Sequence, residues 1–203
     1  MLSKDADYFL ELQTQTGWGR TLFGFAKWCD PKPGWLILDV GCGPGLLPAI
    51  FSQFGCKAVG VDLDLEMFKP RHLHPVMAVG DALRLPFKPH SFDLITSTNL
   101  LFLLPEPVTT LIEIKRLLCS GGKLALLNPS ERLDTSAALR FADEQGLEGM
   151  AKSTLFNWAR RAEGNHRWTE DETRALFTAA GMSYGGGILK VGPGFGRFSW
   201  GTA

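Results

Sequence analysis

The sequence lacks several patterns that identify common binding sites. Its four cysteines, at positions 29, 42, 56 and 119, include no C-x-x-C pair. This spacing argues against a metal site and a disulfide framework and is consistent with a reducing, cytoplasmic location. Basic and acidic residues both number 21, so the formal net charge is zero. A balanced charge provides no electrostatic footprint for nucleic acid or an anionic membrane.

Long apolar runs are absent as well. Residues 1–5 contain no apolar signal core, and the longest apolar run, residues 100–104, ends at Pro105. Neither stretch is long enough to span a membrane, so we expect no membrane segment. The 203 residues are 45% apolar and 21% charged, which is typical of a single globular domain with a large core.

The sequence is organised around residues 36–45, LILDVGCGPG. The first five residues are mostly apolar and predict a strand buried on both faces, while a helix is expected from Leu46. Strand, glycine turn and helix bring the backbone close to a nucleotide-like ligand, because glycine has no Cβ and the helix N-terminus has free N–H groups. The dinucleotide fingerprint requires its third glycine where Leu46 stands, and the phosphate loop is absent.

Two later apolar runs also lead to an acidic residue. Residues 58–62 end at Asp62, about twenty residues after the first glycine, where a Rossmann-like sheet places a carboxylate that binds ribose hydroxyls. The third run begins at Val76 and continues into Gly80 and Asp81. Carboxyl ends of parallel strands meet at one edge of a sheet, so we expect both acids to face one crevice above the glycine turn.

These motifs resemble those of class I S-adenosylmethionine (SAM)-dependent methyltransferases, in particular the type 11 group that includes small-molecule and ubiquinone-biosynthesis-like enzymes. The resemblance rests on Asp39 with the G-x-G-x-G turn, on Asp62, and on the string G-D-A-x-x-L-P-F at 80–87. It implies an α/β fold: a Rossmann-like, seven-stranded, mostly parallel sheet with helices on both faces and a C-terminal antiparallel hairpin. Within one domain we expect an N-terminal helical region (1–34), a SAM-binding core (35–128), a helical cap insertion (130–168), and a last helix with the terminal hairpin (169–203).

The resemblance also implies the cofactor contacts. The glycine turn would pack against the amino acid part of SAM, Asp62 would bind the ribose, and Asp81 would accept from the adenine amino group. Arg20 is a candidate partner of the SAM carboxylate, with a solvated helix charge as the equally weighted alternative. The predicted cofactor-binding residues are Arg20, Asp39, Gly41, Cys42, Gly43, Pro44, Gly45, Asp62, Leu63, Asp81, Ala82, Leu83, Asn99 and Leu100.

The methyl acceptor is less well specified. The predicted substrate pocket contains Trp18, Phe102, Leu103 and Trp158. Phe102 and Leu103 stand where many relatives carry histidines, so the site needs another base or none. Tyr8, Glu131 and His166 are the candidates for a catalytic base. An acceptor that ionises readily, such as a thiol or an acidic phenol, would react without one.

The resemblance therefore implies SN2 transfer of a methyl group from SAM to an O, N, S or C nucleophile on a small molecule, leaving S-adenosyl-L-homocysteine (SAH). Three alternatives remain open: a non-catalytic SAM-binding module, a methyltransferase acting on RNA or protein, and an NAD-binding protein. We expect a small-molecule partner, no nucleic acid, no membrane span, no metal, and a monomer or homodimer.

Local patterns predict the remaining elements. Residues 5–29 are expected to be helical with an interruption at 16–20, and a helix from Pro105 is expected to stop at Gly121–Gly122 before a strand at 123–127. Residues 128–130 are interpreted as a turn. Thr169 with Glu172 forms a capping-box pattern for the last helix, and residues 184–202 are expected to form a hairpin.

Overall fold

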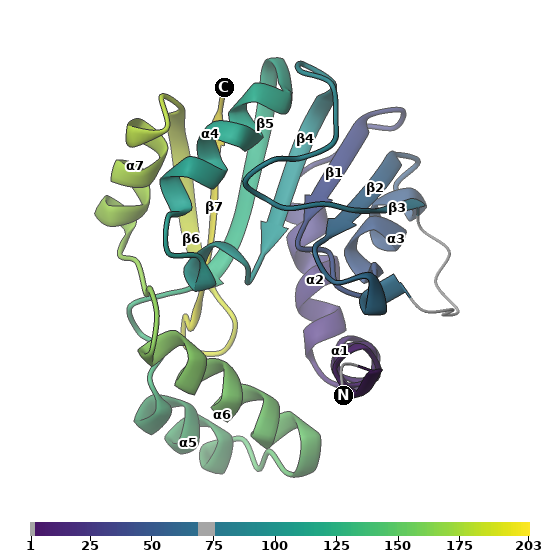
Figure 1. The fold of residues 1–203 in the computed structure, drawn as a ribbon. Helices are drawn as coiled ribbons and strands as arrows, with labels where there is room; N and C mark the ends of the chain where they lie inside the picture. The colour runs from purple at the N-terminus through teal and green to yellow at the C-terminus, as the bar shows by residue number, and fades with distance from the viewer. Residues whose placement is uncertain (1–2, 69–75) are drawn as a thin grey trace.

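The computed structural model describes residues 3–68 and 76–203. Within them, seven strands form one sheet in the order β3-β2-β1-β4-β5-β7-β6 (Figure 1). Strands β1 to β5 pair in parallel, and β7 pairs antiparallel with both β5 and β6. The predicted fold is therefore confirmed. The strands are β1 (Leu36–Val40), β2 (Lys57–Asp62), β3 (Val76–Val79), β4 (Phe92–Thr98), β5 (Leu118–Pro129), β6 (Ser183–Lys190) and β7 (Gly196–Thr202).

Helices cover both faces of the sheet (Figure 1). Helices α2 (Trp18–Trp28) and α3 (Leu46–Gln53) pack on one face, and α4 (Pro107–Leu117) and α7 (Glu170–Ala179) pack on the other. Successive residues of a strand point to opposite faces. Ile37 accordingly joins the core cluster beneath α2, while Leu38 joins the cluster beneath α4. Burial on both faces explains why the β1 sequence is nearly continuous in apolar residues.

Three further helices lie near the carboxyl end of the parallel strands (Figure 1). They are α1 (Ser3–Gln15), α5 (Thr135–Glu144) and α6 (Gly149–Glu163). Two short 3-10 turns, η1 (Leu65–Phe68) after β2 and η2 (Leu101–Leu103) after β4, lie near the same edge. Helix α1 contacts both η1 and α6, and α5 packs against α6. No helix among the described residues has the length and apolar character needed to cross a membrane.

The predicted break in the N-terminal helical region is confirmed at residues 16 and 17, whereas residues 18–20, expected to belong to the break, form the first turn of α2. The Thr16 hydroxyl accepts a hydrogen bond from the Trp18 N–H at 3.1 Å. Gly19 lets the two helices approach closely, since a Cβ at this position would overlap the Gln13 carbonyl oxygen. The break between α1 and α2 and their close approach therefore depend on the hydrogen bond of the Thr16 hydroxyl and on the absence of a side chain at Gly19.

Two predictions about β5 are wrong. Helix α4 ends at Leu117, and β5 begins at once, so Gly121 and Gly122 lie inside the strand. The predicted turn at 128–130 is also mostly strand, because Asn128 and Pro129 pair with β7. Hydrogen bonds to β4 and β7 extend β5 at both ends, and those partners are distant in the sequence. Local glycine and proline signals cannot report them.

The predictions for the last third are confirmed by local contacts. The Thr169 hydroxyl accepts from the Glu172 N–H while the Glu172 carboxylate accepts from the Thr169 N–H, which completes the capping box of α7. The hairpin forms as β6 and β7. Helices α5 and α6 account for the helical character expected at 130–168, and Asp134 caps α5 by accepting from the Ala137 N–H at 2.6 Å.

Candidate functional site

The glycine turn after β1 has a backbone conformation that favours glycine. Gly41, Gly43 and Gly45 have φ values of +75°, +53° and +88°, in the region that L side chains rarely adopt. A Cβ on Gly41 would lie 2.9 Å from the Leu100 side chain, whereas a Cβ on Gly43 would meet no atom within 4 Å. Gly45 precedes the first turn of α3 without a side-chain cap. The turn thus packs against the loop after β4 at Gly41 and faces open space at Gly43.

Asp62, the last residue of β2, is bound to this turn. Its Oδ2 accepts from the Gly43 N–H at 2.8 Å, and its Oδ1 accepts from the Asp64 N–H at 3.0 Å. A carboxylate accepts more than one hydrogen bond at each oxygen, so both oxygens retain capacity for a ligand. The half-buried Asp62 side chain therefore lies beside the turn, as predicted from its position along the sequence.

Asp81 adjoins the same edge through β3. The Gly80 N–H donates to the Asp62 carbonyl oxygen at 3.0 Å, which links the end of β3 to the end of β2. The exposed Asp81 carboxylate accepts from the Leu83 N–H at 2.9 Å through Oδ1. The side chains of Leu63 and Leu83 are 70% and 48% exposed. The ends of the neighbouring strands β2 and β3 therefore each present one carboxylate, of Asp62 or Asp81, and one exposed apolar side chain, of Leu63 or Leu83.

The loop after β4 completes this edge. Asn99 has a φ of +55° and its backbone N–H donates to the Leu127 carbonyl oxygen at 2.8 Å. The Trp158 Nε1–H of α6 donates to the Asn99 Oδ1 at 3.0 Å, and the Trp158 ring meets the Trp18 ring edge-on at 5.5 Å. Three segments distant in the sequence, α2, the β4 loop and α6, are joined here by two tryptophans and an asparagine.

Comparisons with known proteins agree with this geometry. Residues 38–126 match the family model described as a methyltransferase domain. Over 101 residues, which are 49% of this chain and 44% of the relative, the chain is 37% identical to the demethylmenaquinone methyltransferase of Corynebacterium kroppenstedtii. The matched region thus spans less than half the length of that relative.

Residues 38–126 thus resemble a methyltransferase domain, in agreement with the predicted family and its cofactor, SAM.

Solved structures share the fold of the methyltransferase domain at low sequence identity. A chain in the complex of the Haloferax volcanii Trm112 methyltransferase activator with a methyltransferase has a TM-score of 0.71 and 18% identity, covering 99% of this chain and 95% of that one. Magnesium protoporphyrin IX methyltransferase from Synechocystis PCC 6803, solved with bound SAH, has a TM-score of 0.63 and 18% identity, covering 91% and 83% of the two chains.

The other predicted site residues lie in varied surroundings. Arg20 is exposed in the first turn of α2 and has no ion-pair partner among the described residues. Leu100 contacts the glycine turn, Leu103 is 36% exposed, and Phe102 is 1% exposed within the core of the methyltransferase domain. Cys42 is buried, and burial raises the pKa of its thiol far above the ordinary value. Pro44 lies within the turn and Ala82 beside Asp81.

The three candidate bases make different contacts. The Glu131 carboxylate pairs with the buried Arg197 guanidinium at 3.0 Å and 3.2 Å. The His166 ring stacks on the Trp168 ring at 5.3 Å, and its backbone N–H donates to the Phe102 carbonyl oxygen. Tyr8 lies on α1, half-buried and edge-on to a neighbouring phenylalanine. The His166 N–H thereby links the segment between α6 and α7 to η2, the 3-10 turn that follows β4.

Sequence reasoning missed the partner of Asp39. This carboxylate is 2% exposed, and the Thr96 hydroxyl of β4 donates to its Oδ1 at 2.8 Å. Burial raises the pKa of Asp39 to about 7, the Thr96 hydrogen bond opposes this increase, and the nearby Asp62 charge adds to it. The polar run Thr96-Ser97-Thr98 inside a core strand was the available signal, because buried hydroxyls require partners.

The elevated pKa of Asp39 predicts an unusual pH dependence of stability. The pKa rises from an ordinary 3.8 to about 7 on folding, so between these values the folded protein keeps a proton that the unfolded chain loses. The free energy of unfolding should therefore fall as the pH rises from about 4 to 7, by on the order of 4 kcal/mol from this residue. Asp39→Asn should lack this decrease. Urea unfolding of both proteins at pH 4, 5.5, 7 and 8 measures it, and parallel pH profiles would contradict the assignment.

Proposed function

We propose that this chain transfers the methyl group of SAM to a nucleophile on a small molecule by SN2 displacement. The observation that carries the proposal is the set of contacts that joins four strand ends: Gly43 with Asp62, Gly80 with Asp62, and Gly41 with Leu100. A glycine turn, two carboxylates and an amide-bearing loop are thereby held along one edge. In open α/β sheets, ligands bind beyond the carboxyl ends of the strands where the strand order reverses, and here that point lies between β1 and β4.

The residues at this edge fit SAM. The open space above Gly43 admits the part of a ligand that lies against the backbone. Arg20, which has no ion-pair partner among the described residues, offers a guanidinium for the ligand's carboxylate. Asp62 retains acceptor capacity for ribose hydroxyls, and the Asp81 Oδ2, which accepts no hydrogen bond from the described residues, would accept from the adenine amino group. The exposed Leu63 and Leu83 side chains would cover the purine ring.

Asn99, Leu100, Leu103, Trp18 and Trp158 would form the acceptor side. SAM, when bound, supplies a methyl group that is already activated, so these residues mainly orient the acceptor and exclude water. The two tryptophans present flat, rigid surface, and the Asn99 Oδ1 is engaged by Trp158 while its amide N–H groups have no acceptor among the described residues. This arrangement suits a planar acceptor with an oxygen that accepts from Asn99.

We infer that the acceptor ionises without an enzymic base. Glu131 is held in an ion pair with Arg197, and Asn99 is contacted by Trp158 of α6, whose ring in turn meets Trp18 of α2. An acidic phenol or quinol meets this requirement and is planar. One of the relatives supports the class by its name, which specifies demethylmenaquinone, a planar quinone whose reduced form is a quinol.

Transfer from isotopically labelled SAM to matched acceptors tests the proposal. We expect turnover to be fastest with an acidic phenol or quinol, slower with a thiol, and slowest with an amine or a carbon acid. Activity confined to acceptors of high pKa would overturn the base-free mechanism and direct attention to His166. Binding of SAM without turnover on any acceptor, including RNA and protein, would favour a non-catalytic module, and preference for NAD in calorimetry would overturn the proposal itself.

Trp158→Phe is expected to impair use of the acceptor and spare the cofactor. The substitution keeps an aromatic ring but removes the Nε1–H donor to Asn99, a hydrogen bond worth about 1 kcal/mol, so kcat/KM for the acceptor should fall roughly five- to tenfold. The affinity for SAH should change less than twofold in calorimetry. Trp35→Phe, at the amino end of β1, is the matched control and should alter neither quantity. Equal losses in both variants would remove Trp158 from the acceptor site.

A further inference from the structure

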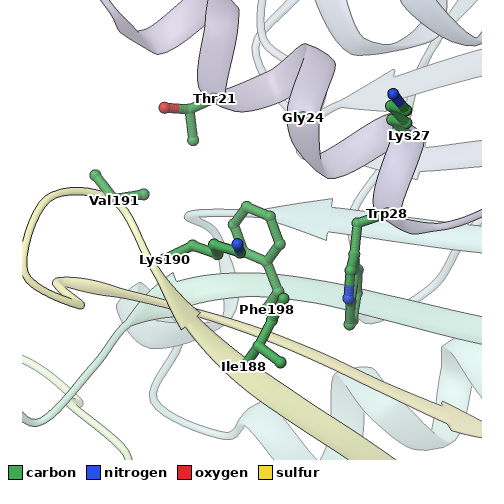
Figure 2. Close-up of a pocket in the computed structure, with 8 residues that line it drawn as sticks. All are labelled: Thr21, Gly24, Lys27, Trp28, Ile188, Lys190, Val191 and Phe198. Carbon is green, nitrogen blue, oxygen red and sulfur yellow. The ribbon is translucent and has the colours of Figure 1, made fainter.

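A groove, separate from the edge of the sheet described above, lies between α2 and the terminal hairpin (Figure 2). This α2–hairpin groove has a volume of about 390 Å³, within the range of small-molecule sites. Its lining comes from two parts of the chain that are distant in the sequence: Thr21, Gly24, Lys27 and Trp28 of α2, and Ile188, Lys190, Val191 and Phe198 of the hairpin.

The groove exists because α2 stops short of the edge strand. The Phe198 ring of β7 packs against the Phe25 and Trp28 rings at 5.0 Å and 5.5 Å, so α2 covers β7. Strand β6 lies beyond it, and Ile188, which pairs with Phe198, remains 37% exposed on the same face. Figure 2 shows Trp28 directed from α2 towards Phe198 and Ile188, which form the apolar floor.

Gly24 keeps the groove open. This residue lies in the middle of α2, where glycine is the poorest helix former apart from proline. A Cβ at position 24 would meet no atom within 4 Å, so no close approach of another element requires glycine here. Its helical neighbours Thr21 and Trp28 line the same groove. A larger side chain at this position would instead extend into the space between the helix and the hairpin.

The charges around the groove have one sign. Lys27 lines it from α2 and Lys190 from β6, and no acidic residue is among the lining residues. Neither lysine makes an ion pair or a side-chain hydrogen bond within the part of the chain that the structure describes. By contrast, Lys123, which also lies near Trp28, is engaged by the Cys29 carbonyl oxygen and by the Trp200 ring.

We propose that the α2–hairpin groove binds an anionic small molecule with a flat apolar body. The body would lie on Phe198, Ile188 and Trp28, and its carboxylate, sulfonate or phosphate would meet Lys27 and Lys190 at the rim. Aromatic and aliphatic floor residues with a few charged groups are the usual composition of such sites. The proposal is independent of the methyl-transfer reaction, because none of the lining residues belongs to the predicted cofactor or acceptor set.

Calorimetric titration of the full chain with 2-naphthalenesulfonate and with neutral 2-naphthol tests this site. We expect the sulfonate to bind at least fivefold more tightly at low salt, and this preference to shrink as the ionic strength rises. Excess SAH should displace neither probe. Equal affinity for both probes, or displacement by SAH, would overturn the proposal.

Variants locate the binding within the groove. Gly24→Leu should weaken both probes at least tenfold without lowering the melting temperature, since leucine is the better helix former. The double variant Lys27→Ala/Lys190→Ala should remove the preference for the sulfonate and leave the affinity for 2-naphthol unchanged. Lys57→Ala/Lys88→Ala is the charge-matched control and should bind both probes as the wild type does.

Sedimentation with phosphatidylcholine vesicles containing phosphatidylglycerol separates a groove from a membrane-binding face. Vesicle binding that Gly24→Leu leaves intact, together with no binding of 2-naphthalenesulfonate, would overturn the small-molecule site. If Gly24→Leu fails to fold, the lysine variants and the salt dependence decide the outcome, because they alter charge at exposed positions alone.

Discussion

Gly43→Ala is expected to weaken the affinity for SAH about tenfold to a hundredfold while the protein remains folded. The added Cβ would meet no protein atom within 4 Å, so its main contact would be with a ligand placed above the turn. Forcing a methyl group into occupied space costs about 1–3 kcal/mol, which corresponds to this range of affinity. Calorimetric titration with SAH measures the loss directly.

Gly43→Ala should also lower the free energy of unfolding, and this effect can be measured separately from the loss of affinity. Alanine at a φ of +53° is strained by about 1–2 kcal/mol, and this strain lowers the free energy of unfolding whether or not a ligand is present. Gly121→Ala provides the matched control, because Gly121 has a φ of +74° and equally open surroundings in β5. Both variants should lose similar stability, and only Gly43→Ala should lose affinity for SAH. Equal affinities in the two variants would show that the space above Gly43 is not the cofactor site.

Asp62→Asn is expected to reduce the affinity for SAH by a similar factor, for a different physical reason. Hydrogen bonds to a charged acceptor are each worth about 1.5–3 kcal/mol, and the ribose would lose at least one. The amide can also turn an N–H towards the Gly43 N–H, which now donates to Oδ2 at 2.8 Å, and two donors facing each other would disturb the turn. Titration of the variant with SAH and with adenosine shows whether the loss belongs to the nucleoside part of the ligand.

Asp64→Asn serves as the control for Asp62. Asp64 lies two residues away and accepts from the Glu66 N–H at 2.9 Å through Oδ1, a local cap that an asparagine oxygen can replace. We expect its affinity for SAH to stay within twofold of the wild type. An Asp62→Asn protein that melts as the wild type does and binds SAH within threefold of it would exclude Asp62 from the cofactor site.

Features that depend on neighbouring residues could be predicted well. The Thr169 hydroxyl and the Glu172 carboxylate satisfy each other's backbone N–H groups within one helical turn, so four consecutive residues contain the whole signal. The glycine turn is similar, because positive φ at Gly41, Gly43 and Gly45 is a property of those residues themselves. The resemblance extended this local reading to an ordered set of strands, which the sheet order confirms.

Features that depend on pairing between distant segments could not be predicted from the sequence. Gly121 and Gly122 look like a helix stop, yet they lie inside β5, because Leu118 before them and Lys123 after them both pair with β4 across a local irregularity of the ladder. Glu131 looks like a free carboxylate in a cap, yet the Arg197 guanidinium 66 residues away holds it at 3.0 Å. No spacing rule connects such residues, since only the packing of the chain brings them within reach of one another.

The sequence by itself therefore determined the strand–turn–helix unit, the acids that follow the next strands, and the family model that residues 38–126 match. Tertiary structure alone decided that Asp39 is buried against Thr96 and that Trp158 reaches Asn99. It also decided that α2 leaves β6 uncovered beside Gly24. The physical reason is that backbone conformation and capping act over a few residues, whereas desolvation and side-chain contact depend on which distant surfaces the sheet brings together.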